Sequence, residues 1–159
     1  MRKLTKEEIL LTFTPRVRKK IILPSLEEIV WDQLDFLGWV HPSGHLGYVV
    51  YNSPSLGIKS LFLHRAIPKW GRGVRMCSWC NTMRPFREVA LFSTTRLYNI
   101  ERSIGDYICA DFGCSLYVRG KPLNIVQMGE TISVKEKIQR LHRNIEKFFL
   151  LVKKLREKE

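Results

Sequence analysis

The segments Cys77-Ser78-Trp79-Cys80 and Cys109-Ala110-Asp111-Phe112-Gly113-Cys114 decide the fold of this chain, because they hold all four of its cysteines. The first pair has the spacing of a zinc knuckle, a tight turn that lets two sulfurs face one tetrahedral ion. The second pair follows a strand-like run, Asp106–Cys109, and leads into the start of a helix. The two pairs therefore predict one structural Zn²⁺ ion, bound by Cys77, Cys80, Cys109 and Cys114.

A first cysteine pair on a loop and a second pair at a strand-to-helix junction form the layout of a treble-clef zinc finger. Two disulfides or free thiols are an alternative, and so is a redox-active Cys-X-X-Cys motif. However, no secretory signal precedes the cysteines, and the redox motif would open a helix in a βαβ setting that the sequence does not show. Four thiolates would close the coordination shell, so the ion is expected to hold structure and not to activate water.

The net charge of +12 is unevenly distributed along the 159 residues. Residues 59–121 carry eleven Lys and Arg against four Asp and Glu, a net of +7, and residues 133–159 carry nine against four, a net of +5. Residues 1–58 are nearly neutral, with seven against six. A basic surface of this kind favours an acidic partner, such as RNA, the ribosome or an acidic protein. The alternative is that the charge only keeps the protein in solution.

The composition indicates a single folded domain over residues 1–159, because 45% of the residues are hydrophobic. Its zinc finger is expected at about 74–121 and a C-terminal helix at about 133–157. No apolar run approaches the roughly 20 residues that a membrane span needs, and no signal peptide is recognisable. We therefore expect a cytoplasmic protein without a membrane partner.

Two capping boxes predict short helices near the N-terminus. Thr5-Lys6-Glu7-Glu8 should begin a helix that ends at about Phe13, before Pro15, and Ser25-Leu26-Glu27-Glu28 repeats the signature after Pro24. The basic residues between Arg16 and Lys20 are expected to form a solvated loop. In the segment that follows, the large side chains are expected to seal a core and a glycine to end a turn: Trp31, Leu34 and Phe36, then Gly38.

Strand-like runs follow in the middle of the chain. Leu46–Tyr51 and Gly57–His64 flank a turn and should form an antiparallel hairpin. Val89–Thr94 and Gly105–Cys109 predict two further strands around a loop at Arg96–Ser103. After them, a short helix should begin at Cys114 and close at Gly120. The predicted fold class is α+β: a small antiparallel sheet with a treble-clef zinc finger, short N-terminal helices and a long C-terminal helix.

Ser133 and Glu136 form a third capping box, at the start of the final helix. Apolar residues recur in this helix at steps of three and four and should pack against the sheet or the first two helices: Val134, Ile138, Leu141, Ile145, Phe148, Val152 and Leu155. A coiled-coil homodimer is the alternative use of this stripe.

Catalytic signatures are not recognisable in the sequence. None of the four histidines adjoins a nucleophile motif, and no glycine-rich phosphate loop precedes a helix. We therefore expect a protein that is not an enzyme and has no small-molecule substrate.

Three segments resemble the elongation factor G-binding proteins, the family of the FusB/FusC-type fusidic acid resistance proteins with a C-terminal treble-clef zinc finger. They are Trp31–Trp39, Met76–Cys80 and Tyr107–Gly120, and the resemblance covers nearly the whole chain from about Leu4. It implies a zinc-containing α+β domain that binds elongation factor G and helps to release it from the ribosome when the drug stalls it. The longer resistance proteins carry an additional N-terminal helical bundle for which this sequence leaves no room, so the expectation concerns factor binding before resistance.

Four residues are candidates for the interface with that factor: Trp79, Arg84, Tyr107 and Arg119. Trp70 and Trp79 are expected to be exposed anchors beside basic residues, whereas Tyr107 and Arg119 could instead pack around the zinc loops. The alternative function is an RNA- or ribosome-binding zinc-finger protein. Direct binding to RNA would lose affinity steeply with salt, and a factor interface with a hydrophobic centre would lose it more gently.

Overall fold

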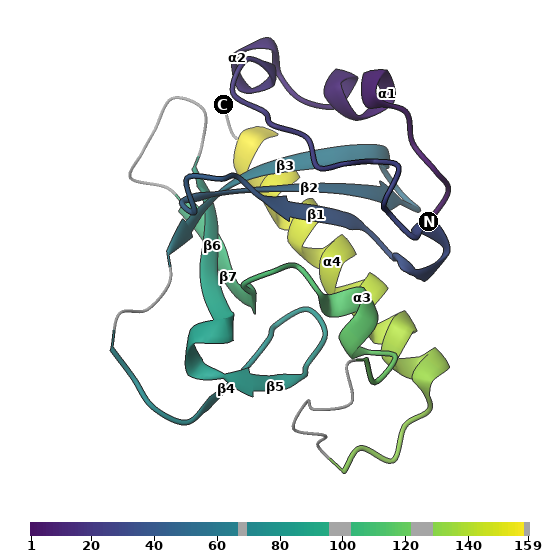
Figure 1. Cartoon of the computed structure of the whole chain (residues 1–159), viewed down its shortest axis with the longest axis vertical. Coiled ribbons are helices and arrows are strands. Elements are labelled where there is room, and N and C mark those ends of the chain that lie inside the picture. The colour runs from purple at the N-terminus through teal and green to yellow at the C-terminus, as the bar shows by residue number, and fades with distance from the viewer. Residues whose placement is uncertain (67–69, 96–102, 122–128, 158–159) are drawn as a thin grey trace.

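A computed structural model describes residues 1–66, 70–95, 103–121 and 129–157 of the chain. Within these residues the fold is α+β, as predicted. An antiparallel sheet of five strands in the order β1-β2-β3-β6-β7 lies between the N-terminal segment and the long helix α4 (Figure 1). The strands run over Leu37–Val40 (β1), Leu46–Ser53 (β2), Gly57–Ala66 (β3), Val89–Thr95 (β6) and Ser103–Cys109 (β7). A small hairpin of β4 (Val74–Met76) and β5 (Met83–Pro85) carries the first cysteine pair.

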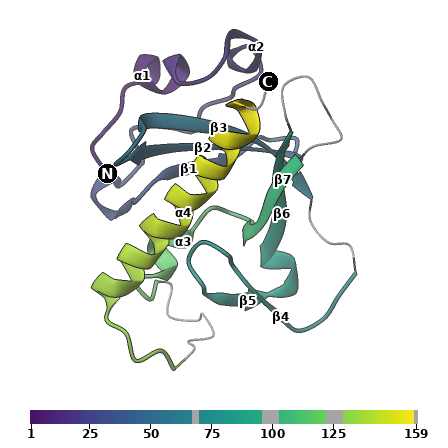
Figure 2. The ribbon, with the colours of Figure 1, turned by 180° about the vertical axis from the view of Figure 1, so that it is seen from behind.

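The helices are short except for the last one. They cover Lys6–Leu11 (α1), Pro15–Arg18 (α2), Cys114–Tyr117 (α3) and Val134–Glu157 (α4), with 3₁₀ turns at Trp31–Gln33 (η1) and Phe86–Glu88 (η2). Helix α4 crosses the back of the sheet diagonally (Figure 2). Among the described residues, no helix combines the length and apolar character required to cross a membrane.

The sheet separates two hydrophobic cores, because β2 buries both of its faces and β3 buries one face and covers the other in part. Val49 and Tyr51 of β2 join the core that contains α4 and the cysteines. Tyr48 and Val50, which point to the opposite face, join a second core under the N-terminal segment. This arrangement explains why neither strand shows a clean alternation of polar and apolar residues.

Two of the three predicted capping boxes are formed. Thr5 accepts from the Glu8 amide and Glu8 accepts from the Thr5 amide, so α1 begins as predicted, although it ends at Leu11. Ser133 and Glu136 make the same reciprocal bonds before α4. The apolar stripe of α4 is largely buried, and Leu141, Ile145 and Phe148 lie in the first core.

Three local predictions for the N-terminal third were wrong. Ser25–Glu28 forms turns and not a helix, and the basic segment begins with the short helix α2 instead of a loop. Gly38 lies inside strand β1 and does not end a turn. In each case contacts with the second core or the zinc loops outweigh the local signal. The expected loop at Arg96–Ser103 lies outside the described residues except for Ser103, which begins β7.

Gly38 is required by packing. A Cβ atom at this position would lie 2.6 Å from Cβ of Phe112, and one at Gly47 would lie 2.9 Å from Cζ of the same ring. The two glycines thus open the space on β1 and β2 into which the second cysteine loop inserts Phe112. The zinc loops and the sheet are therefore fitted to each other.

Replacement of Gly38 by alanine tests this fit. We expect Gly38→Ala to lower the free energy of unfolding by roughly 1–3 kcal/mol, because the added methyl group overpacks Phe112. Gly129→Ala is the matched control, since a Cβ there meets nothing within 4 Å, and chemical denaturation should place it within about 0.5 kcal/mol of the parent. Equal effects of the two variants would contradict the close approach at Gly38.

Candidate metal centre and its surroundings

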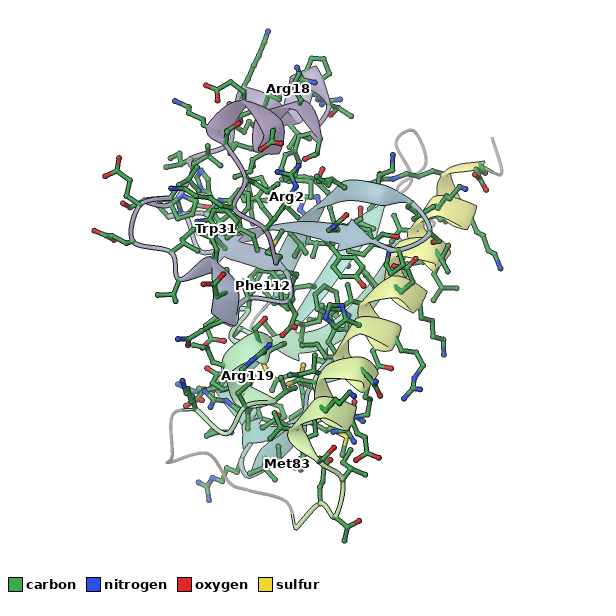
Figure 3. All side chains as sticks on the ribbon, turned by 90° about the vertical axis from the view of Figure 1, so that its right-hand side faces the viewer. Arg2, Arg18, Trp31, Met83, Phe112 and Arg119 are labelled. Atoms are coloured by element: carbon green, nitrogen blue, oxygen red, sulfur yellow. The ribbon has the colours of Figure 1, made fainter. Side chains whose placement is uncertain are left out.

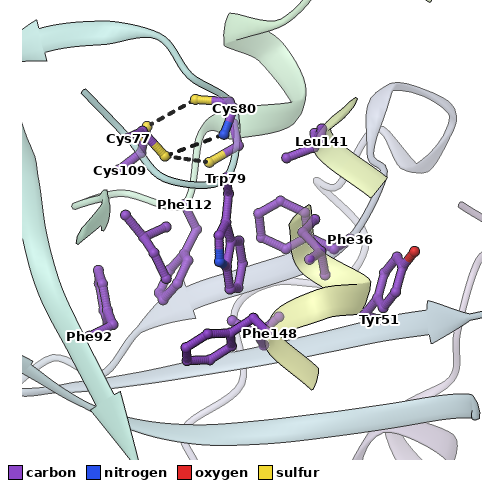
Figure 4. Close-up of a cluster of buried hydrophobic side chains, with 14 of the residues drawn as sticks. Phe36, Tyr51, Cys77, Trp79, Cys80, Phe92, Cys109, Phe112, Leu141 and Phe148 are labelled. Carbon is purple, nitrogen blue, oxygen red and sulfur yellow. Dashed lines mark hydrogen bonds between the residues drawn. The ribbon is translucent and has the colours of Figure 1, made fainter. Parts of the chain in front are cut away.

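The four cysteines meet in the interior of the molecule. Their Sγ atoms all lie within 4.8 Å of one another, and every one of these residues is buried. The shortest separations are 3.7 Å for Cys77 and Cys114 and 3.6 Å for Cys80 and Cys109 (Figure 4). Four sulfurs around a tetrahedral zinc, each about 2.3 Å from the ion, would lie about 3.8 Å apart. The donor set and its spacing therefore fit zinc, and the cysteines form no disulfide.

The first pair sits on a tight turn between β4 and β5. The Cys77 amide donates to the Thr82 carbonyl, and the Asn81 amide donates to the Cys77 carbonyl at 2.9 Å. Asn81 adopts a left-handed conformation, with φ 58°, which asparagine tolerates better than most residues. This geometry turns both sulfurs towards the same point. The prediction of a knuckle on a loop is thus confirmed.

The second pair brackets the junction of β7 and α3. Cys109 is the last residue of β7 and Cys114 the first of α3. Between them, the Asp111 carboxylate accepts from the Gly113 amide at 2.9 Å. Phe112 has a left-handed φ of 57°, and this directs its ring away from the metal centre and onto the sheet. Gly120 ends the helical turn with φ 71°, as predicted.

The electrostatics of this cluster call for a cation. Burial raises the pKa of the Cys114 thiol, and its neighbour Cys109 raises it further. Four sulfurs at this separation become thiolates together only when a dication compensates their charge, and binding of the ion then releases protons. A closed shell of four thiolates leaves no position for a reacting water.

Trp79 connects the knuckle to α4. Its side chain has no exposed surface, and its indole ring meets Phe36 at 5.4 Å and Phe148 of α4 at 5.7 Å, both edge to face (Figure 4). From α4, the Asn144 side chain donates to the Trp79 carbonyl at 2.9 Å. The helix therefore holds the knuckle through both an apolar contact and a backbone hydrogen bond.

A buried carboxylate ties the second zinc loop to the start of β1. Arg119, labelled in Figure 3, donates to Asp35 at 2.6 and 3.2 Å, and His142 of α4 lies 3.1 Å from the same carboxylate. The Asp35 amide donates to the Ser115 hydroxyl. Burial would raise the pKa of Asp35, but the hydrogen bonds from His142 and Arg119, with the charge of Arg119, outweigh it and bring the pKa to about 2.

The four predicted interface residues occupy very different environments. Tyr107 is 40% exposed. The expectation that Trp79 is exposed was wrong, because the tight turn folds its indole into the first core. Arg84 forms an ion pair with Glu88, and its guanidinium carbon stacks 4.0 Å from the centre of the Tyr117 ring. Arg119 is held by Asp35. Trp70, in contrast, is 88% exposed, as expected.

The sequence did not show which distant residues meet the zinc loops. Phe36, Asp35 and His142 reach the zinc loops from segments far away in the chain, and a single sequence does not show such a meeting. For His142, the sequence showed only that no nucleophile motif adjoins it. Asn144 and Arg140 of α4 also bind the knuckle, and nothing in the sequence indicated this. Arg140 donates to the Cys80 carbonyl at 3.4 Å.

The site has the three parts of a treble-clef zinc finger. These are the knuckle, the hairpin of β6 and β7, and the helix α3, whose first residue supplies the last sulfur. The family model for the FBP C-terminal treble-clef zinc-finger matches residues 9–152. The chain therefore belongs to this family, which confirms the resemblance seen in the sequence, and it binds one structural zinc ion.

Comparison with solved structures gives the same fold. The structure of the fusidic acid resistance protein FusC matches with a TM-score of 0.62 at 19% sequence identity, over 94% of this chain. The match covers 59% of the FusC chain, so this chain spans less than two thirds of that protein. No curated protein matches at a significant level.

Loss of one sulfur should remove both the metal and the fold around it. We expect Cys109→Ser to lose zinc and to lower Tm by roughly 10 °C or more, because the binding energy of a structural zinc is part of the folding energy. Zinc content by atomic emission and thermal unfolding check this, with the exposed Ser78→Ala as a control inside the same knuckle. A Cys109→Ser protein with full zinc content and unchanged Tm would contradict the structural role.

The interactions of Asp35 predict how the stability of the fold depends on pH. Because the pKa of Asp35 falls from 3.8 to about 2 on folding, its ionised form stabilises the fold by about 2 kcal/mol. That stabilisation is complete above about pH 4 and is lost as the pH falls towards 2.

At neutral pH, Arg119→Met should cost roughly 1–3 kcal/mol, because it leaves the buried carboxylate of Asp35 with His142 alone. The double variant Asp35→Asn with Arg119→Met should recover part of that loss, and Arg143→Met, on an exposed arginine of α4, is the control. Additive effects of the two single substitutions in chemical denaturation would refute the coupling.

Proposed function

We propose that this protein binds translation elongation factor G through the zinc-finger end of the molecule and promotes release of that factor from the ribosome. Membership of the zinc-finger family and the fold shared with FusC support the proposal. FusC is a fusidic acid resistance protein, and we extend the proposal to a role of the same kind. A closed, four-sulfur zinc site further supports a binding role, since it offers the ion no catalytic position.

The observation that carries the proposal is an exposed aromatic and apolar surface around the β4–β5 hairpin. Trp70, Val74, Met76 and Tyr107 are all substantially exposed there. The guanidinium of Arg75 lies between two rings, 4.0 Å from the centre of Phe86 and 4.1 Å from that of Tyr107. Tryptophan, tyrosine and arginine are the residue types that dominate binding energy at protein interfaces.

The rigid setting of this surface favours a protein partner. The Ser78 amide of the knuckle donates to the Tyr107 carbonyl at 2.8 Å, so the strand that carries Tyr107 is fixed to the metal centre. Stacking on two rings likewise restrains Arg75. A pre-ordered set of anchors loses little conformational entropy on binding. The net charge of +7 on residues 59–121 would add attraction towards an acidic factor.

An RNA- or ribosome-binding protein is the second candidate, and the same basic charge favours it. Arginine beside exposed aromatic rings also suits stacking on bases. The two candidates differ in how binding responds to salt. Neutralisation of several phosphates gives a steep loss of affinity as salt increases, whereas an interface with an apolar centre is less sensitive.

Titration of the zinc-loaded protein with purified elongation factor G, by calorimetry, tests the proposal. We expect one-to-one binding with Kd of about 1 µM or tighter, weakened less than about tenfold between roughly 0.1 M and 0.5 M salt. Tyr107→Ala and Trp70→Ala should each weaken binding by about 10-fold or more with unchanged thermal stability.

Leu11→Ala is the matched control, because this leucine is also exposed but lies on α1, away from the finger. It should leave the affinity unchanged. Absence of binding at both salt concentrations would refute the proposal. Binding to ribosomal RNA with a steep salt dependence would favour the second candidate instead.

A further inference from the structure

A groove of about 510 Å³ lies between the last turns of α4 and the β2–β3 hairpin. Ser55, Leu56 and residues 59–61 line one side, and Phe149, Val152, Lys153, Arg156 and Glu157 line the other. This end of α4 lies far from the β4–β5 hairpin in both ribbon views (Figures 1 and 2). The groove is therefore separate from the metal centre and from the surface proposed to bind the elongation factor.

The inner wall of this groove is apolar and firmly packed. Leu61, Phe149 and Val152 belong to the first core and are almost completely buried, and Leu56 packs against them. Phe149 also contacts the ring of Tyr51, with 5.5 Å between ring centres. These buried side chains support the wall from behind, and the apolar surface within reach of a ligand is that of Leu56 and the aliphatic part of Lys59. A wall that rests on core residues is already formed before anything binds to it, which is typical of small-molecule sites, as is a volume in this range.

Positive charge gathers at the mouth of the same groove. Among the described residues, its lining includes the cations Lys59, Lys153 and Arg156 and one carboxylate, that of Glu157. Glu157 lies 3.4 Å from Lys153, and both side chains are at least half exposed, so that ion pair is weak and easily exchanged. Three cations against one anion leave the mouth positive.

Arg156 is the least satisfied of these cations. Its Nε atom is buried and has no hydrogen-bond partner among the residues that the structure describes. Burial also lowers the pKa of this guanidinium. Because the Nε atom has almost no accessible surface, an incoming anion would meet this guanidinium through its two terminal nitrogens.

The two serine hydroxyls do not serve this purpose. Ser60 donates to the Thr12 carbonyl at 2.8 Å, and Ser55 donates to Glu146. An inorganic anion would therefore meet cations only and would leave the apolar wall uncovered. A ligand with both a charged group and an apolar body matches the whole groove.

We propose that this groove binds an amphipathic organic carboxylate, with the carboxylate between Lys153 and Arg156 and its apolar chain along Leu56 and the aliphatic part of Lys59. Decanoate is a suitable probe, because it combines one carboxylate with a chain that fits the stated volume. Decanol, which keeps the chain, and inorganic phosphate, which keeps the charge, separate the two contributions.

Calorimetric titration of the zinc-loaded protein tests this site. Decanoate, below its micelle concentration, should bind one-to-one with Kd on the order of 100 µM, and decanol and phosphate should each bind at least about tenfold more weakly. Arg156→Met should weaken decanoate binding by about tenfold, and Lys153→Gln by about threefold or more.

Lys154→Gln is the matched control, since it makes the same change on the neighbouring residue of α4, which does not line the groove. It should leave the affinity for decanoate unchanged. Equal affinities for decanoate and decanol, equal effects of Lys153→Gln and Lys154→Gln, or no binding of decanoate at 1 mM would each overturn the proposal. Because Lys153→Gln changes only an exposed side chain, the test stands even if Arg156→Met destabilises the fold.

Discussion

The fold depends on the attachment of the zinc knuckle to α4 through Trp79. The knuckle forces its tryptophan inward, and the indole ring fills the space between Phe36 and Phe148. From the helix, Asn144 and Arg140 donate hydrogen bonds to the backbone carbonyls of Trp79 and Cys80, respectively. A small zinc loop thereby fixes a helix of 24 residues across the sheet. Since so short a hairpin buries little surface of its own, the metal and this one aromatic side chain supply the order that the hairpin cannot.

The second cysteine loop fastens the other side of the finger to the sheet. Phe112 enters the space left by Gly38 and Gly47, and Arg119 reaches the buried Asp35 that precedes β1. Both contacts join residues more than 60 positions apart in the chain. The zinc site and the five-stranded sheet therefore share one packed interior. The outer surface of the finger, with Trp70 and Tyr107, is the surface that we propose for binding the partner.

The sequence predicted those features that depend on local signals. Cysteine spacing gave the metal centre, the period of α4 gave its buried stripe, and the boxes at Thr5 and Ser133 gave two helix starts. The wrong predictions are those in which a distant contact decides. The box at Ser25 does not begin a helix, because Leu26 and Ile29 pack on the second core. Gly38 lies in a strand because it pairs with Val49 of β2, and it is a glycine because Phe112 packs against it. Trp79 was predicted to be exposed because its contacts with Phe36 and Phe148 join segments that are distant in the sequence.

The central claim is that zinc organises the whole α4 side of the molecule and not the finger alone. Hydrogen exchange of the backbone amides, compared with and without a zinc chelator, tests it most directly. We expect removal of zinc to abolish protection in the knuckle, in β6 and β7 and in α4 together. Loss of protection confined to residues 74–85 and 109–119, with α4 still protected, would contradict it.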